Sequence, residues 1–92
     1  MNPSLLPELL PGDVLVMSRE GMNVSGNAHA YRKNSRGALE VVRELPDRAR
    51  ALVIDTSGAP WLVGVLVCGV LGLVRGQEVV RVERDGKQVP GA

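Results

Sequence analysis

Few residues of this chain could carry out catalysis, and they do not form a recognisable pattern. His29 is the single histidine and Cys68 the single cysteine. A catalytic nucleophile needs a base within hydrogen-bond distance and usually a third group that orients the base. Ser57 or Cys68 would therefore have to meet His29 and Asp55 in space. Because nothing local supports such a meeting, the sequence predicts a protein that is not an enzyme.

The same shortage of reactive residues argues against a metal centre. One histidine and one cysteine cannot supply the four ligands of a structural zinc site within one chain. We therefore predict no metal site and no cofactor. Cys68 lies inside an uncharged run, residues 59–74, where an unpaired thiol usually behaves as a small hydrophobic group.

The best candidate for binding is the polar segment of residues 23–36, which combines glycines with basic side chains. We expect a helix to begin near Gly37, so that its positive end would favour an anion here. One tyrosine could stack on a base or on a partner's side chain, but it does not make the aromatic platform of single-strand binders. A solvated loop is the plain alternative. The predicted ligand-binding or partner-binding residues are His29, Tyr31, Arg32, Lys33 and Arg36.

Overall charge and the N-terminal residues limit the classes of partner and location. Eleven basic and ten acidic residues leave a net charge of +1, which does not suit a protein that mainly neutralises a phosphate backbone. Nucleic acid is therefore an unsupported partner. Prolines and Glu8 interrupt the first leucines, so no secretory signal is evident and a cytoplasmic location is expected.

The uncharged run APWLVGVLVCGVLGLV, residues 59–74, must be hidden from water. Its sixteen residues are short for a membrane-spanning helix, which needs about 20, so a membrane partner is not expected. Pro60 and Ser57 would suit the start of a buried helix. Three glycines and several valines disfavour that helix, and we prefer a buried pair of strands. An element of an interface is the third possibility.

A chain of 92 residues is long enough for one domain and has a modest stability margin. A second copy could complete the burial of its large apolar segment, so we expect a homo-oligomer and possible binding of a protein partner. Apolar residues of the first twelve positions and of the uncharged run are the candidates for this contact. The predicted self-association residues are Leu5, Leu6, Leu9, Leu10 and Trp61.

Local patterns predict the elements that must position these residues. Strand-like segments occur at residues 13–18, 51–55 and 78–84, and Asp85-Gly86 is typical of a tight hairpin turn. Apolar residues at 38, 41, 42 and 45 have the spacing of an amphipathic helix, which Pro46 would end. We therefore predict a mixed α/β (α+β) fold of about four to six strands with one helix near residues 38–45. The expected organisation is a proline-rich arm at 1–12, one globular domain at 13–89 and a tail at 90–92.

Residues 51–67, ALVIDTSGAPWLVGVLV, resemble the strand and following turn of STAS domains, the fold of anti-sigma-factor antagonists. In that family an aliphatic strand ending in Asp precedes an Asp-Ser or Asp-Thr pair whose hydroxyl is phosphorylated. Val63 and Gly64 stand roughly where that pair would fall, so the resemblance implies a β/α unit but no regulatory hydroxyl. We do not assign the chain to the family.

Two functions follow from these observations. The first is a small non-catalytic protein that acts through self-association and partner binding. The alternative is a regulatory module that binds an anionic ligand or nucleic acid through residues 23–36. Salt distinguishes them, because phosphate binding weakens steeply as ionic strength rises and apolar association does not.

Overall fold

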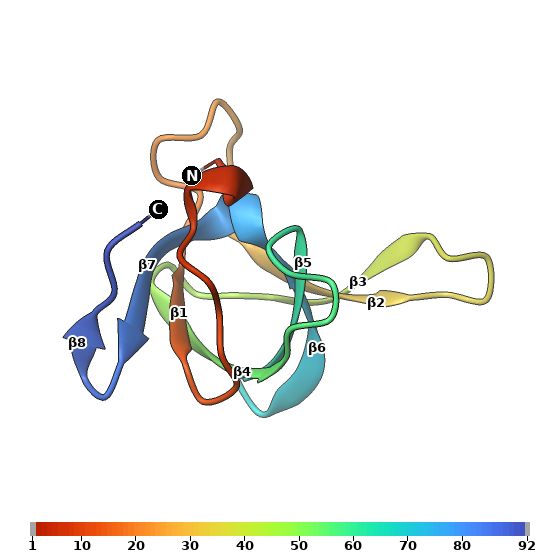
Figure 1. Ribbon diagram of the computed structural model, residues 1–92. Coiled ribbons are helices and arrows are strands. Elements are labelled where there is room, and N and C mark those ends of the chain that lie inside the picture. Colours follow the sequence, from red (N-terminus) through yellow and green to blue (C-terminus); the bar gives the residue numbers. More distant parts are fainter. Residues whose placement is uncertain (1, 92) are drawn as a thin grey trace.

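A single curved antiparallel sheet forms the body of the protein in a computed structural model that describes residues 2–91 (Figure 1). Within these residues the only helical segments are two short 3-10 turns, η1 (Pro3–Leu5) and η2 (Gly76–Glu78). The eight strands occur in the spatial order β3-β2-β6-β5-β4-β1-β7-β8. They are β1 (Val14–Met17), β2 (His29–Lys33), β3 (Leu39–Glu44), β4 (Ala49–Asp55), β5 (Leu62–Val67), β6 (Val70–Arg75), β7 (Val79–Arg84) and β8 (Lys87–Gln88).

The prediction of an α+β fold with a helix at 38–45 is wrong, because these residues form β3 and the sheet has eight strands. The Asn34 side chain accepts hydrogen bonds from the backbone N–H groups of Arg36 and Ala38, which closes a tight turn. This turn returns the chain alongside β2, where β3 finds its backbone partners. Eight residues are too few for a stable isolated helix, so the available strand partner decides the conformation.

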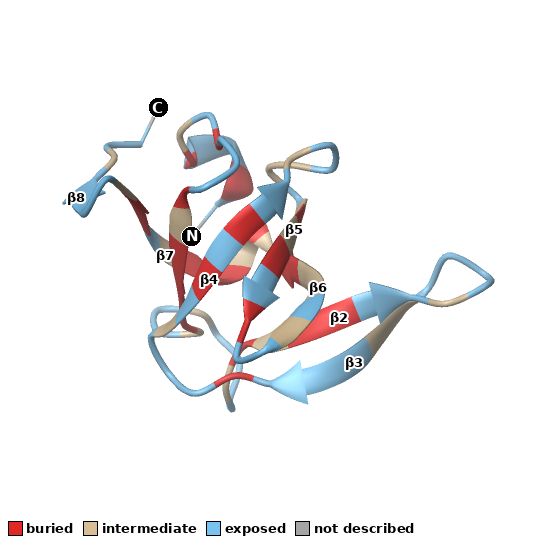
Figure 2. Ribbon diagram, turned by 90° about the horizontal axis from the view of Figure 1, so that it is seen from below, coloured by how far each residue is buried: buried red, intermediate tan, exposed pale blue. Residues whose placement is uncertain are grey.

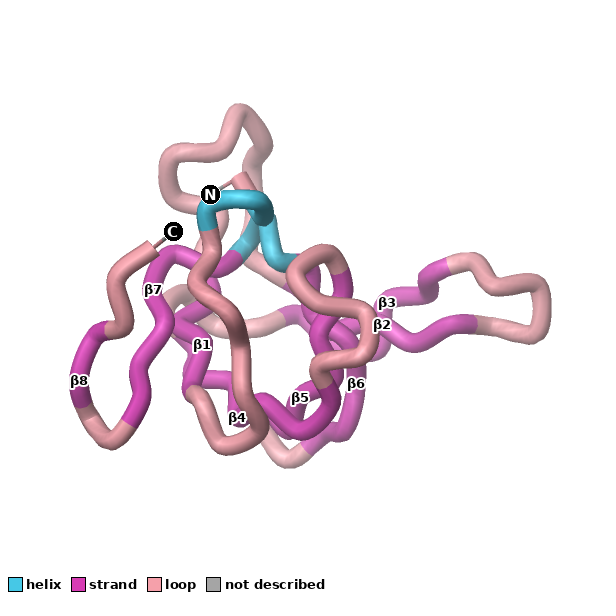
Figure 3. Tube along the Cα trace, in the orientation of Figure 1, coloured by secondary structure: helices cyan, strands magenta, loops and turns pink. Residues whose placement is uncertain are grey.

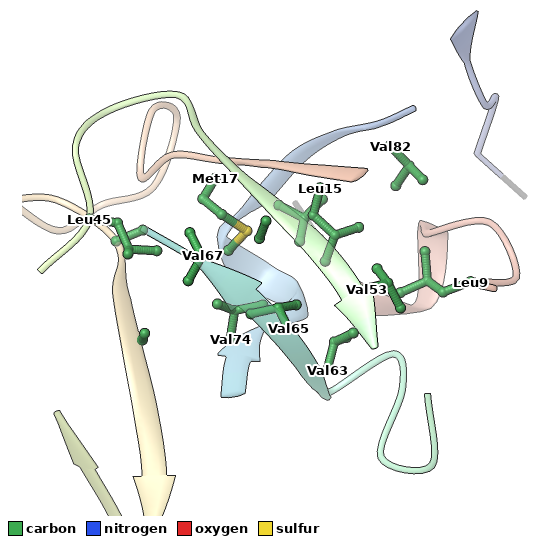
Figure 4. Close-up of a cluster of buried hydrophobic side chains, with 14 of the residues drawn as sticks. Leu9, Leu15, Met17, Leu45, Val53, Val63, Val65, Val67, Val74 and Val82 are labelled. Atoms are coloured by element: carbon green, nitrogen blue, oxygen red, sulfur yellow. The ribbon is translucent and has the colours of Figure 1, made fainter. Parts of the chain in front are cut away.

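The sheet curls so that one face of its central strands encloses the core (Figure 4). Side chains on a strand alternate between the two faces. In β5 this alternation buries Val63, Val65 and Val67, and they pack with Leu15 and Met17 of β1. Removal of these apolar groups from water is the main favourable contribution to the fold.

The uncharged run forms the β5–β6 hairpin, which agrees with the preferred strand pair. Its turn places Cys68 at φ 50° and Gly69 at φ 75°, as a type I′ hairpin turn requires. Cys68 is consequently exposed, although its place in the run predicts burial. The β/α unit implied by the STAS resemblance is absent, because β4 is followed by a turn and the antiparallel strand β5.

The three other strand-like segments correspond to β1, β4 and β7, and the Asp85-Gly86 turn connects β7 to β8. The polar segment is less irregular than its composition predicts. Residues 29–33 form β2, and only the stretches on either side of β2 are loop or turn (Figure 3). Outside the body of the sheet, the β2–β3 hairpin projects away from the molecule (Figure 1).

Candidate functional site

A row of exposed leucines crosses the outer face of the sheet. Leu52, Leu66 and Leu71 lie directly opposite one another on the adjacent strands β4, β5 and β6. The exposed fractions of Leu52, Leu66 and Leu71 are 38%, 40% and 72%, respectively. The neighbours of Leu52 and Leu66 along their strands are buried in the core, so alternation turns both leucines outward, and the pairing register places Leu71 on the same face. Figure 2 shows this pattern as alternating buried and exposed residues along β4. We call these three residues the leucine row.

A charged cluster lies at one end of the leucine row. Val14 of β1 is opposite Leu52 on one side and Glu83 of β7 on the other. The Glu83 carboxylate contacts Arg50 at 3.0 Å and Arg81 at 2.5 Å. An apolar centre with a charged border is the usual composition of a protein interface. Exposed contiguous apolar surface of this kind marks interaction sites on soluble proteins.

His29 of the predicted set belongs to a different cluster, which joins three separate parts of the chain. The Arg19 guanidinium contacts the Glu78 carboxylate at 2.6 Å, and this hydrogen bond raises the pKa of Arg19 above its ordinary value. A second guanidinium nitrogen lies 3.1 Å from His29 Nδ1. Since arginine can only donate, His29 Nδ1 is the acceptor of this hydrogen bond. His29 is therefore already engaged in holding β2 against the end of β1.

Tyr31 is held in the same region. Its ring centroid is 6.2 Å from that of His29, and the Arg75 guanidinium lies 4.8 Å above the ring. The tyrosine is only 5% exposed, so no open ring face is available for stacking on a base. These contacts are cation–π and packing contacts within the fold.

The basic members of the predicted set lie on the projecting hairpin. Arg32 contacts the Glu40 carboxylate at 3.2 Å, and both side chains are largely exposed. Hydrogen bonds from Asn34 and Arg32 lower the pKa of Glu40 below its usual value. No helix begins near Gly37, so the helix dipole expected to support an anion site is missing. His29, Tyr31, Arg32 and Lys33 all lie on β2, and Arg36 lies in the turn that follows. His29 and Tyr31 contact Arg19 and Arg75. Arg32 contacts Glu40, so the structure does not bring the five residues into one site.

The predicted self-association residues also divide into two groups. Leu6 and Leu9 are buried in the core, at 6% and 5% exposure. Leu5, Leu10 and Trp61 are exposed. Sequence reasoning missed the leucine row. The alternation of residues 51–54 was the available signal, since two small buried residues alternate there with Leu52 and an exposed isoleucine.

The residues considered for catalysis are not assembled. The Asp55 carboxylate accepts hydrogen bonds from the Ser57 backbone N–H at 2.9 Å and from its hydroxyl at 3.1 Å. These bonds lower the pKa of Asp55 below its ordinary value. His29 instead contacts Arg19, and Cys68 is at a hairpin turn.

Two further features bear on possible functions. Over residues 2–91, no three His, Cys, Asp or Glu side chains are grouped closely enough to hold a metal ion. The same part of the chain contains no helix of the length and hydropathy that crossing a membrane requires. Comparison of the chain with protein-family models, curated proteins and solved structures found no match, so the arrangement of these residues carries the functional argument.

Proposed function

We propose that this chain is a small non-catalytic protein that acts by self-association through the leucine row and by binding a partner protein. The leucine row is the observation that carries the proposal. Its three side chains come from adjacent strands, lie in register and remain exposed. The core beneath them is filled by other residues, so burial of the row requires a second surface.

A second copy of the chain is the occupant that we favour. A two-fold dimer brings the same patch of both copies together, and an apolar row satisfies that requirement because apolar groups complement one another. The row crosses three paired strands and therefore presents a rigid surface at little entropic cost. Arg50 and Arg81, which flank Glu83, would lie at the border of such an interface and remain hydrated.

Light scattering across a size-exclusion peak tests this proposal. We expect the full chain to elute as a sharp dimer or a higher closed oligomer. Lysine at both Leu66 and Leu71 would place charge in the interface and remove two apolar contacts. Each replacement is expected to cost about 2 kcal/mol of association free energy, so the dissociation constant rises at least about 100-fold.

Val24→Lys is the matched control, because Val24 is an exposed apolar residue in a loop outside the row. This variant should keep the wild-type mass. A wild-type monomer, or equal masses for the wild type and the Leu66→Lys, Leu71→Lys variant, would overturn self-association through this face.

A second candidate is the binding of an anionic ligand or nucleic acid through residues 23–36. It is supported by the exposed side chains of Arg32, Lys33 and Arg36 on a hairpin that projects from the body (Figure 1). The pairing of Arg32 with Glu40 reduces the positive charge there. Steep weakening by salt would favour this function over apolar association.

A further inference from the structure

A small cleft lies on the outer face of the sheet beside the leucine row, because Gly64 and Leu73 of its lining are two residues from Leu66 and Leu71 along β5 and β6. Its volume is about 290 Å³, which is at the small end of ligand-binding pockets. Strands β2, β4, β5 and β6 and the segments next to them supply its lining. The lining includes Lys33, Asp55, Trp61, Leu62, Gly64 and Leu73.

Gly64 allows Asp55 to pack closely against β5 at the edge of this cleft. It lies between Asp55 of β4 and Leu73 of β6 in the pairing register. A Cβ atom at Gly64 would lie 2.9 Å from the Asp55 Cβ, too close for an ordinary contact. The missing side chain therefore lets Asp55 approach β5 closely, and Asp55 and Leu73 stand on either side of Gly64 at the cleft.

Two unlike charges face this space from opposite sides. The Asp55 carboxylate is held in place by both hydrogen bonds from Ser57, and each oxygen keeps a further lone pair free to accept. Lys33 comes from β2, and strands β5 and β6 lie between it and Asp55. Within residues 2–91, Lys33 forms no ion pair. The cleft thus offers an oriented anion and an available cation.

The surface between the two charges is apolar and aromatic. Trp61 is 63% exposed, and Leu62 and Leu73 are half-buried beside the hollow. A tryptophan ring provides a large contact area with few rotatable bonds. An apolar group that enters the cleft can therefore contact Trp61, Leu62 and Leu73 between the two charged residues.

We propose that this cleft binds a free apolar α-amino acid. The ligand's ammonium group would bond to the Asp55 carboxylate, its carboxylate would pair with the Lys33 ammonium, and its side chain would pack against Trp61, Leu62 and Leu73. A purely cationic or purely anionic ligand would satisfy one protein charge and meet the other as a like charge. A zwitterion satisfies both, and charge-assisted bonds are the stronger class of hydrogen bond.

Titration of the full chain with L-leucine, followed by two-dimensional NMR of the amides and the Trp61 indole, tests the proposal. We expect saturable shifts confined to the cleft, with a dissociation constant of about 0.1 to 1 mM for a ligand of this size. N-acetyl-L-leucine lacks the ammonium charge and L-leucinamide lacks the carboxylate. Each should bind at least about 10-fold more weakly than L-leucine. Absence of saturable shifts up to about 10 mM would overturn the proposal.

Two variants test which charged side chain of the protein contacts each charged group of the ligand. Asp55→Asn should weaken L-leucine binding and abolish the preference for L-leucine over its N-acetyl form. Lys33→Met should abolish the preference over L-leucinamide, and this exposed hairpin position tolerates the change. Lys87→Met on β8 is the matched control and should leave binding unchanged. Equal binding of L-leucine and both derivatives by the wild type would contradict the zwitterion site, because neither the ammonium nor the carboxylate of L-leucine would then contribute to binding.

The amino-acid site and the proposed self-association can be tested independently. The Leu66→Lys, Leu71→Lys variant removes apolar contacts from the leucine row and leaves every named cleft residue in place. Its mass should fall while it still binds L-leucine in preference to both derivatives. If the wild type is a monomer that still binds L-leucine, only the proposed self-association fails. If an oligomer shows no binding, only the amino-acid site fails.

Discussion

The buried carboxylate of Asp13 connects the N-terminal segment of the chain to strand β7. Its oxygens accept hydrogen bonds from Arg84 at 2.7 and 2.8 Å and from the Leu10 backbone N–H at 2.9 Å. Arg84 also donates to the Glu8 carbonyl oxygen at 3.1 Å. The hydrogen bond from Arg84 is the main reason that the pKa of Asp13 lies below its ordinary value, and burial opposes this shift. The N-terminal segment is thus bound to β7 through one ion pair.

We predict that this ion pair contributes to stability only while Asp13 is ionised. Since the pKa of Asp13 is lower in the folded protein than in the unfolded chain, its contribution is complete above the unfolded value of 3.8. The contribution is lost as pH falls through the lower folded value. Asp13→Asn should therefore reduce the free energy of unfolding by about 1.5 to 3 kcal/mol at neutral pH. Urea unfolding should show this difference shrink below pH 3.8.

Glu44→Gln is the control for the acid experiment, because within residues 2–91 the Glu44 carboxylate accepts only an exposed side-chain hydrogen bond from the Asn27 amide. Its free energy of unfolding should stay close to that of the wild type at neutral pH. A difference between wild type and Asp13→Asn that is constant over the whole pH range would show that the effect is steric rather than ionic.

At the scale of elements, two hairpins have turns of the same backbone conformation, but one joins central strands of the sheet and the other joins strands at its edge. Cys68-Gly69 joins the central strands β5 and β6, and Asp85-Gly86 joins β7 to the two-residue strand β8. All four turn residues have positive φ, between 50° and 76°. A Cβ atom at either glycine would meet no other atom within 4 Å. Alanine at either glycine therefore strains the backbone without creating a clash.

We predict that the two alanine variants differ in their effect on global unfolding. A residue with a Cβ in the left-handed region costs roughly 1 to 2 kcal/mol. Gly69→Ala should lower the global free energy of unfolding by about that amount, because β5 and β6 can separate only when the core opens. Gly86→Ala should mainly speed local hydrogen exchange at β8 and change global urea unfolding by less than about 0.5 kcal/mol. Equal global losses would contradict this ranking of the two hairpins.

At the scale of the whole molecule, residues 2–10 are part of the folded body. Leu6 and Leu9 join the core cluster, whereas Leu5 and Leu10 face solvent. The two ends of the described chain also meet, because a Cβ atom at Gly91 would lie 2.6 Å from the Leu5 carbonyl oxygen. A small domain buries a limited share of its surface, so each buried leucine matters to its stability.

We predict that the N-terminal leucines fall into two energetic classes. Leu9→Ala should reduce the free energy of unfolding by about 2 to 5 kcal/mol, because it leaves a cavity in the core. Leu10→Ala, at 45% exposure, should change it by less than about 0.5 kcal/mol. Thermal and urea unfolding of both variants test this difference. Similar small losses for both would show that the segment is a detachable arm, as the proline content of residues 1–12 suggests.

Several features could be predicted from sequence because they depend on neighbours in the chain. The alternation of residues 78–84, the Asp85-Gly86 turn and the strand pair within residues 59–74 each reflect local backbone preferences and side-chain periodicity. The scarcity of catalytic and metal-binding residues is likewise a property of composition. The folded protein keeps these features because they depend on local sequence and not on contacts with distant segments.

Other features exist only because distant segments meet. Residues 38–45 carry a helical spacing of apolar groups, but pairing with β2 supplies the backbone bonds that decide for a strand. Arg19 contacts Glu78, which is 59 residues away, and it also contacts His29. His29 is therefore engaged inside the fold and is not a free side chain of the candidate polar loop. The leucine row and the cleft arise from the register of strands from different parts of the sequence. Local periodicity predicts which side chains share a face of one strand, whereas strand order and curvature determine which face is buried and which residues become neighbours.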